Sequence, residues 1–196
     1  MQILKAGGVL HRNHARGYAP AQFNPGRGES MRFSPFDDAS GACVPTLYAA
    51  TSREAAAFET IFHDIDAKAP FKTVWLGVVE NRSVSRLVTR RDLFLAILFT
   101  PDLKAWGLTR ADLIDTPKSA YPRTASWAGA IHAAHPKLDG MIWTSRQCDP
   151  DRCLVLFGDR VSEAGFDIAE RLDVGKDAGL LLELRGFGRR AGIFIR

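Results

Sequence analysis

Four side chains in this sequence have the chemistry to act together on a dinucleotide. Arg32 begins the stretch Arg-Phe-Ser-Pro, Tyr48 lies in the apolar run Leu-Tyr-Ala-Ala, and Glu59 follows eleven residues after the tyrosine. Ser145 ends a second apolar run far downstream. A guanidinium binds phosphate, an aromatic ring stacks on a planar base, and a carboxylate stabilises positive charge on a sugar carbon. The set suits binding a dinucleotide and breaking a bond to its ribose, provided that the fold brings the four together.

The segment around Tyr48 and Glu59 predicts a strand, a turn and a helix. Pro45–Ala50 is a short apolar strand. Thr51 is expected to cap the helix, because Glu54 three residues later completes a capping box. Glu59 then lies about 100° round the helix from Phe58, at the edge of the buried face. That face is predicted from four residues at helical spacing, which are Phe58, Ile61, Phe62 and Ile65.

The remaining pattern mixes strands and helices without a regular alternation, which favours an α+β fold. Residues 16–40 form a long irregular loop rich in Gly, Pro, Asn and Ser. The predicted helices are Arg91–Phe99 and Thr124–His135. The predicted strands are Thr73–Val79, Leu138–Thr144 and Cys153–Phe157, followed by a terminal hairpin of Gly179–Leu184 with Ala191–Ile195. No linker divides the chain, so residues 1–196 are expected to form a single domain.

Composition places the chain among ordinary globular proteins. It has 46% hydrophobic and 24% charged residues and a net charge of +4. The longest apolar run, Leu93–Thr100, is too short to cross a membrane, and the first residues do not resemble a signal peptide. We therefore expect a cytoplasmic protein with no membrane partner. Three cysteines, with only Cys148 and Cys153 close in sequence, predict neither a disulfide framework nor a metal site.

Each candidate residue, taken alone, has a simpler structural interpretation. Glu59 could be a solvated carboxylate, Arg32 an ion-pair partner, Tyr48 a core residue and Ser145 a turn residue. The five histidines show no spacing typical of a ligand set. Neither a glycine-rich dinucleotide loop, a phosphate loop nor a nucleophile elbow is present, which excludes most common nucleotide-binding and hydrolase families.

The order of these motifs resembles the RES domain family, which is named for an Arg, a Glu and a Ser. Arg32-Phe33, then Leu47–Ala50, then Glu59 look like the front half of that domain. Three later stretches are similar to its back half, namely Tyr121–Ala128 (Tyr-Pro-x-Thr-x-x-Trp-Ala), Asp139–Arg146 (Asp-Gly, ending in Ser-Arg) and Cys153–Gly158. The resemblance runs from about residue 10 to residue 161.

This resemblance implies a fold like that of the ADP-ribosyltransferases, with mixed β-sheets and flanking helices. It also implies an enzyme that uses NAD as substrate, needs no cofactor, and is the toxin of a pair with an Xre-type antitoxin. A homo-oligomer or a complex with the antitoxin is expected. By the same resemblance, Glu59 contacts the nicotinamide ribose, Arg32 clamps the pyrophosphate, and Tyr48 stacks on a planar ring. Ser145 binds the ligand or holds Glu59, and Arg12, at the end of the first strand, is a second phosphate-binding candidate.

Two further hypotheses remain open at this stage. A protein ADP-ribosyltransferase would use the same site and differ only in the acceptor. A non-catalytic interaction module would bind a partner protein or nucleic acid through basic residues, although no nucleic-acid-binding motif is present.

Overall fold

The computed structural model describes residues 1–196, and most of its helices and strands are short. The strands are β1 (Gln2–Leu4), β2 (Val9–Ala15), β3 (Thr46–Ala50), β4 (Thr73–Val74), β5 (Arg82–Thr89), β6 (Leu93–Ile97), β7 (Gly140–Thr144), β8 (Arg152–Phe157), β9 (Phe166–Asp173) and β10 (Phe194–Ile195). The helices are α1 (Arg53–Phe58), α2 (Leu76–Glu80), α3 (Thr100–Ala105), α4 (Arg110–Leu113), α5 (Tyr121–Ala134) and α6 (Ala178–Arg190), with 3-10 turns η1 (Lys118–Ala120) and η2 (Glu163–Gly165).

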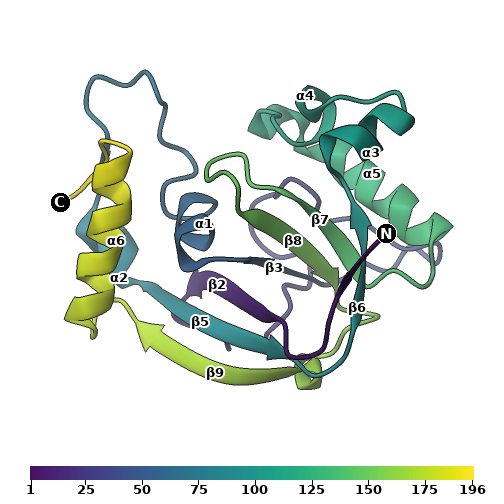
Figure 1. Cartoon of the computed structure of the whole chain (residues 1–196), viewed down its shortest axis with the longest axis horizontal. Coiled ribbons are helices and arrows are strands. Elements are labelled where there is room, and N and C mark those ends of the chain that lie inside the picture. The colour runs from purple at the N-terminus through teal and green to yellow at the C-terminus, as the bar shows by residue number, and fades with distance from the viewer.

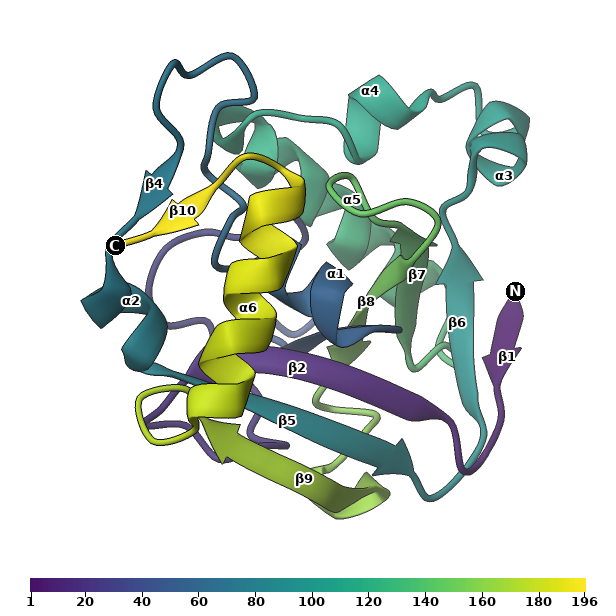
Figure 2. The same cartoon turned by 60° about the vertical axis from the view of Figure 1, so that its left-hand side comes forward.

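One sheet of eight strands organises the molecule. Its order is β1-β6-β7-β8-β3-β2-β5-β9, and all neighbours are antiparallel except β6 and β7. The sheet is strongly curved, with α6 beside its β5–β9 end and α3, α4 and α5 towards the β6–β7 end (Figures 1 and 2). The remaining strands, β4 and β10, form a separate parallel pair. The architecture is mixed α+β, as predicted from the sequence.

Alternate residues of β3 supply the cores on the two faces of the sheet. Leu47 and Ala49 belong to one apolar cluster, whereas Ala50 belongs to the larger cluster on the opposite face. Such alternation is the consequence of a strand whose side chains point to opposite faces in turn. The larger cluster includes Ala55, Ala56 and the other buried residues of α1, so this helix packs on the face of the sheet that also carries Tyr48.

Several predicted elements are confirmed. The strand predicted over Pro45–Ala50 is β3, and the strands predicted over residues 138–144 and 153–157 are β7 and β8. The helix predicted over Thr124–His135 is α5, which begins three residues earlier at Tyr121. Residues 16–40 contain no helix or strand of their own, in agreement with the predicted loop.

The helix predicted over Arg91–Phe99 is wrong, because this segment contains strand β6. Leu93 and Leu95 are buried in one core, and Ala96 lies in the other. A strand buried on both faces has a continuous apolar run, and periodicity cannot distinguish such a run from a buried helix. The strand is defined by its neighbours β1 and β7, which come from distant parts of the chain.

The prediction of a C-terminal hairpin is also wrong. Residues 178–190 form helix α6, where Asp177 caps the first turn by accepting a hydrogen bond from Leu180 N. The buried residues Leu180, Leu184 and Gly188 recur every four positions, a helical spacing that the glycines of this segment obscured. Only Phe194–Ile195 of the predicted second strand is extended, as β10.

Two further boundaries differ from the predictions. Ser52, not Thr51, caps α1 by accepting from Ala55 N, and the helix ends at Phe58 with Glu59 as its C-cap. The predicted apolar stripe therefore continues into turns rather than a longer helix. In the segment predicted as a strand over Thr73–Val79, only Thr73–Val74 is extended, and α2 begins at Leu76.

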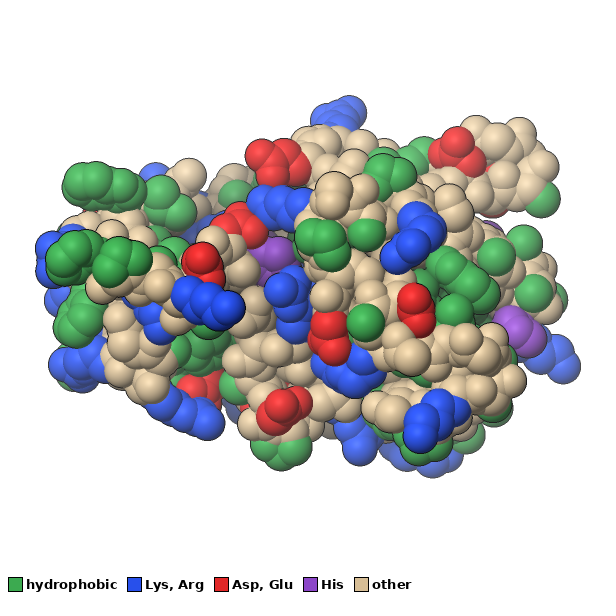
Figure 3. Space-filling model, turned by 90° about the horizontal axis from the view of Figure 1, so that it is seen from above, with side chains coloured by type: hydrophobic (Ala, Val, Ile, Leu, Met, Phe, Trp, Pro, Cys, Tyr) green, Lys and Arg blue, Asp and Glu red, His purple; other side chains and the backbone are tan.

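Exposed aromatic side chains gather around the small β4–β10 pair. Phe71 is 84% exposed, Trp75 78% and Phe194 51%, and Phe194 lies opposite Thr73 in the pair. Hydrophobic side chains are correspondingly collected on the left of Figure 3. None of the helices combines the length and apolar character that crossing a bilayer requires.

Gly140 offers a direct test of the sheet order. It pairs with Leu95 of β6 and Leu156 of β8, and a Cβ added there would lie 2.1 Å from the carbonyl oxygen of Val155. We expect Gly140→Ala to lower the free energy of unfolding by roughly 1–3 kcal/mol, or to prevent folding, because the central strands must separate. Gly186→Ala is the control, since a Cβ in this part of α6 meets nothing within 4 Å and should stabilise the helix by about 0.5–1 kcal/mol. Equal melting temperatures for the two variants would contradict the register.

Candidate active site

A cleft of about 380 Å³ opens beside β2 and β3 and the C-terminal end of α1. Its walls include four of the five residues selected from the sequence, namely Arg12, Arg32, Tyr48 and Glu59. The strands diverge here, since β2 and β3 pair only at His11 and Ala50. The cleft therefore lies where the ladder between two central strands is interrupted.

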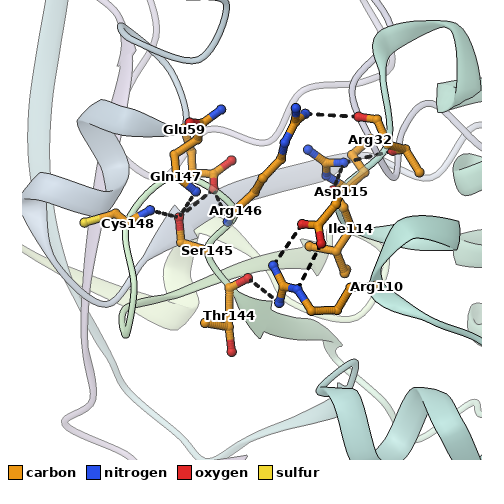
Figure 4. Close-up of polar contacts among 11 residues, drawn as sticks. Arg32, Glu59, Arg110, Ile114, Asp115, Thr144, Ser145, Arg146, Gln147 and Cys148 are labelled. Carbon is orange, nitrogen blue, oxygen red and sulfur yellow. Dashed lines mark hydrogen bonds and ion pairs between the residues drawn. The ribbon is translucent and has the colours of Figure 1, made fainter. Parts of the chain in front are cut away.

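Glu59 is held in place through one of its carboxylate oxygens. Its Oε1 accepts hydrogen bonds from Ser145 Oγ at 2.6 Å and from the backbone N–H of Arg146 at 2.8 Å. Figure 4 shows this carboxylate above the loop that follows β7. The second oxygen, Oε2, has no protein partner. Two donors on one oxygen fix the orientation of the carboxylate and leave the other oxygen for a ligand.

Ser145 acts on Glu59 rather than lining the cleft. Its side chain is buried, and its Oγ accepts hydrogen bonds from the N–H groups of Gln147 at 3.1 Å and Cys148 at 3.0 Å. These contacts orient the hydroxyl so that its proton is directed at Glu59. Of the two roles considered from sequence, the structure contains the contact with Glu59.

Arg32 is buried and partly engaged with the protein. Its Nη1 donates to the carbonyl oxygen of Ile114 and to Thr116 Oγ1 at 2.9 Å, and its guanidinium lies 5.5 Å from the centre of the Tyr121 ring. All its hydrogen bonds to protein leave from Nη1. Nε and Nη2 therefore remain for an anion, and the contacts with residues 114–116 hold the side chain in a defined position.

Tyr48 places a neutral hydroxyl at the same cleft. Its Oη accepts a hydrogen bond from the backbone N–H of Phe33 at 2.9 Å, and its ring meets Trp143 edge-on at a centroid distance of 6.3 Å. Burial raises the pKa of Tyr48 to about 12. The hydroxyl is therefore protonated at neutral pH, and Ser34 Oγ lies 3.4 Å from it.

Arg12 and His14 are buried neighbours on β2. Arg12 lies within the strand rather than at its end, and its Nη1 donates to the carbonyl oxygen of Pro20 at 2.8 Å. Burial lowers the pKa of Arg12 to about 10, which leaves it charged at neutral pH. His14 donates from Nδ1 to its neighbour's carbonyl at Ala15 and accepts at Nε2 from Ser85 Oγ at 2.9 Å.

Two contributors were not predicted from sequence. The N–H of Arg146 binds Glu59, and the Arg146 side chain donates to the carbonyl of Thr116 at 3.1 Å. Arg146 directly follows Ser145 in the Asp139–Arg146 motif, so the motif could have identified it as a site residue. Nothing in the sequence indicated Thr116, because its contact with Arg32 depends on a loop that meets Arg32 only in the folded chain.

The family follows from a match that covers most of the chain. The sequence model of the RES domain matches residues 9–174. The chain belongs to the RES domain family. The resemblance noted over residues 10–161 is thereby confirmed and extended. No curated protein matches the sequence.

A solved structure supports the fold assignment. The chain is similar to one in the crystal structure of the M. tuberculosis MbcT–MbcA toxin–antitoxin complex, with a TM-score of 0.65 and 18% sequence identity. The similarity covers 94% of this RES protein and 92% of the other chain. At this identity the comparison shows a shared fold, and it confirms the predicted fold class.

The buried His14 predicts a specific pH dependence of stability. Burial lowers its pKa from 6.5 to about 4, so between these pH values the unfolded chain binds a proton that the folded protein does not. The contribution of His14 to the free energy of unfolding should therefore rise as pH increases from about 4 to about 6.5. Urea unfolding across this range should show a shallower rise for His14→Asn than for wild type. The exposed His135→Asn variant should keep the wild-type profile, and parallel profiles for all three proteins would contradict the assignment.

Proposed function

We propose that this RES protein cleaves the bond between nicotinamide and ribose in NAD. The observation that carries the proposal is the carboxylate of Glu59, which is fixed at Oε1 by Ser145 and Arg146 and free at Oε2, in a cleft shared with two buried arginines. Membership of the RES family gives the proposal its substrate class.

The chemistry needs only one carboxylate. The pyridinium nitrogen of NAD carries a positive charge, so the C1′–N bond breaks with its electron pair passing to that nitrogen, and neutral nicotinamide leaves. Protonation of the leaving group by a second acid, as in most glycosidases, is unnecessary. Positive charge develops on the ribose, where Oε2 of Glu59 stabilises it and hydrogen-bonds a ribose hydroxyl. The oxygen of water or phosphate then bonds to C1′ and, for water, a proton is released.

The other side chains bind and orient the dinucleotide in this proposal. Arg32 uses Nε and Nη2 for the pyrophosphate, since Nη1 is occupied by residues 114 and 116. Arg12 supplies a second positive charge from the opposite face of β2, where its Nη1 also donates to the carbonyl oxygen of Pro20. Tyr48 presents an aromatic ring to the nicotinamide and a proton from a hydroxyl that burial keeps neutral.

We also propose that the protein is a toxin restrained by an antitoxin. The fold shared with a chain of the MbcT–MbcA toxin–antitoxin complex supports this role. An Xre-type antitoxin is the proposed partner, and the net charge of +4 suits an acidic segment of such a protein.

The group that accepts ADP-ribose distinguishes the leading proposal from its alternatives. Purified protein incubated with labelled NAD, with and without inorganic phosphate, should yield free ADP-ribose or its phosphate. Labelled protein would instead identify an ADP-ribosyltransferase. Absence of nicotinamide release would favour a non-catalytic module. Lys and Arg are mixed with Asp and Glu on the face shown in Figure 3, which argues against a nucleic-acid surface there.

Replacement of Glu59 by Gln should remove the negative charge with little change in shape. We expect nicotinamide release to fall by at least about 10²–10³-fold, because the charge on the ribose loses its main stabiliser. The melting temperature should change little, since Gln keeps an oxygen that accepts from Ser145 and Arg146. Glu163→Gln, an exposed position outside the cleft, should retain full turnover. Wild-type turnover in Glu59→Gln would refute the catalytic assignment.

Replacement of Arg32 by Lys should test the pyrophosphate contact. Lys keeps the charge but lacks the second nitrogen needed for a forked contact, so the apparent KM for NAD should rise about tenfold or more, equivalent to about 1.5 kcal/mol. The control is Arg110→Lys, because Arg110 pairs with Asp115 beside the same loop and does not line the cleft. Thermal unfolding of both variants separates lost affinity from lost structure. An unchanged KM in folded Arg32→Lys would contradict the clamp.

A further inference from the structure

Asn13 carries a buried side-chain amide with no partner. The residue is 7% exposed, and neither Oδ1 nor Nδ2 makes a hydrogen bond. It lies in the middle of β2 and lines the cleft that contains Glu59. Nothing in the chemistry described above uses it.

The register of the sheet places Asn13 beside Tyr48. His11 pairs with Ala50, and Asn13 and Tyr48 are each two residues from that pair, on the side where the two strands are no longer paired. Side chains two residues apart in a strand share a face, so Asn13, His11 and Tyr48 lie on the face covered by α1. The Nδ1 atom of His11 also lacks a partner. Because the strands diverge past the His11–Ala50 pair, a space remains between Asn13 and Tyr48 for a planar group.

Trp143 has the remaining unpartnered buried side-chain nitrogen, and it lines the same cleft, with its ring 6.3 Å from that of Tyr48. It lies on β7, and β8 and β3 separate that strand from β2. Tyr48 on β3 lies between the two strands, so Asn13 is the unpartnered group on the β2 side of the cleft.

An amide left in this state destabilises the folded protein. Each buried polar group without a partner costs about 1–3 kcal/mol, whereas an apolar side chain of the same size would cost nothing of the kind. Asn13 presents an acceptor oxygen and an NH2 group, neither of which has a partner. A planar group that carries a donor beside an acceptor satisfies both at once, and a primary amide does so through two parallel N–H···O hydrogen bonds.

We propose that Asn13 binds the carboxamide of the nicotinamide ring and selects NAD over dinucleotides that carry a carboxylate in its place. This inference rests on the proposed function and identifies the carboxamide as the part of the substrate that Asn13 recognises. A nicotinic acid ring offers two acceptors and no donor, so Oδ1 of Asn13 would face a negatively charged oxygen. A site whose buried polar groups are left unpaired rejects such an analogue far more strongly than an apolar pocket does.

The test compares NAD with nicotinic acid adenine dinucleotide in wild type and Asn13→Leu. Wild type should prefer NAD in kcat/KM by about 10² or more, and Asn13→Leu should reduce that ratio at least tenfold. The melting temperature of Asn13→Leu should hold or rise, because an isosteric apolar side chain replaces an unpaired amide. A purely structural role would lower it. Asn81→Leu is the matched control, since Asn81 is exposed at the end of α2 and outside the cleft.

A direct binding measurement separates this inference from the proposed function. Ligand-observed NMR titration should show nicotinamide, but not nicotinic acid, bound to wild type, with the difference lost in Asn13→Leu. If Asn13→Leu still cleaves NAD with the wild-type preference, the inference is overturned and the function stands. The same holds if the variant loses the same factor in kcat/KM for both dinucleotides. Asn13-dependent nicotinamide binding without NAD cleavage would overturn the function and leave the amide site. Absence of both would overturn the inference.

Discussion

A carboxylate beside an open cleft rotates freely unless the protein holds it, and the candidate site depends on how Glu59 is held. Ser145 Oγ and Arg146 N both donate to Oε1, so the orientation of Oε2 is fixed without occupying it. The donors belong to the loop after β7 and the acceptor to the end of α1, which are 86 residues apart at their shortest separation. The early end of α1 at Phe58 matters for the same reason, because it leaves Glu59 as the C-cap residue facing that loop.

The arginine on the other side of the cleft is positioned by a comparable device. Arg32 lies in an irregular loop, where a long side chain would ordinarily be mobile, yet its Nη1 is tied to residues 114 and 116. Arg146 reaches the same segment through the carbonyl of Thr116. The loop before η1 therefore connects the arginine proposed to bind phosphate with the backbone that orients Glu59, and both groups are arranged before substrate arrives. Such preorganisation is the usual source of electrostatic catalysis.

The cleft also contains buried polar groups that have no partner in the protein. Asn13 and His11 bury polar atoms without partners on a strand that is otherwise fully paired with β5. An interrupted ladder between β2 and β3 exposes this strand to the cleft. Unpaired groups of this kind are tolerated where a ligand completes them, which links a measurable loss of stability to recognition.

Local pattern determined more of the site than of the fold. The motifs around Arg32, Tyr48, Glu59 and Ser145 were sufficient for the family, and the irregular mixture of strand and helix patterns was sufficient for the α+β class, because both are properties of the sequence itself. Whether β6 and α6 are strand or helix was decided by tertiary structure. The apolar run of β6 is a strand because β1 and β7 pair with it on either side. Helix α6 buries Leu180, Leu184 and Gly188 only against the rest of the core. The partners of each functional side chain were decided in the same way. Hydrogen bonds such as those from Ser145 to Glu59 and from Arg32 to Thr116 join residues far apart in the chain, and no local pattern records which distant group the folded backbone will bring within 3 Å.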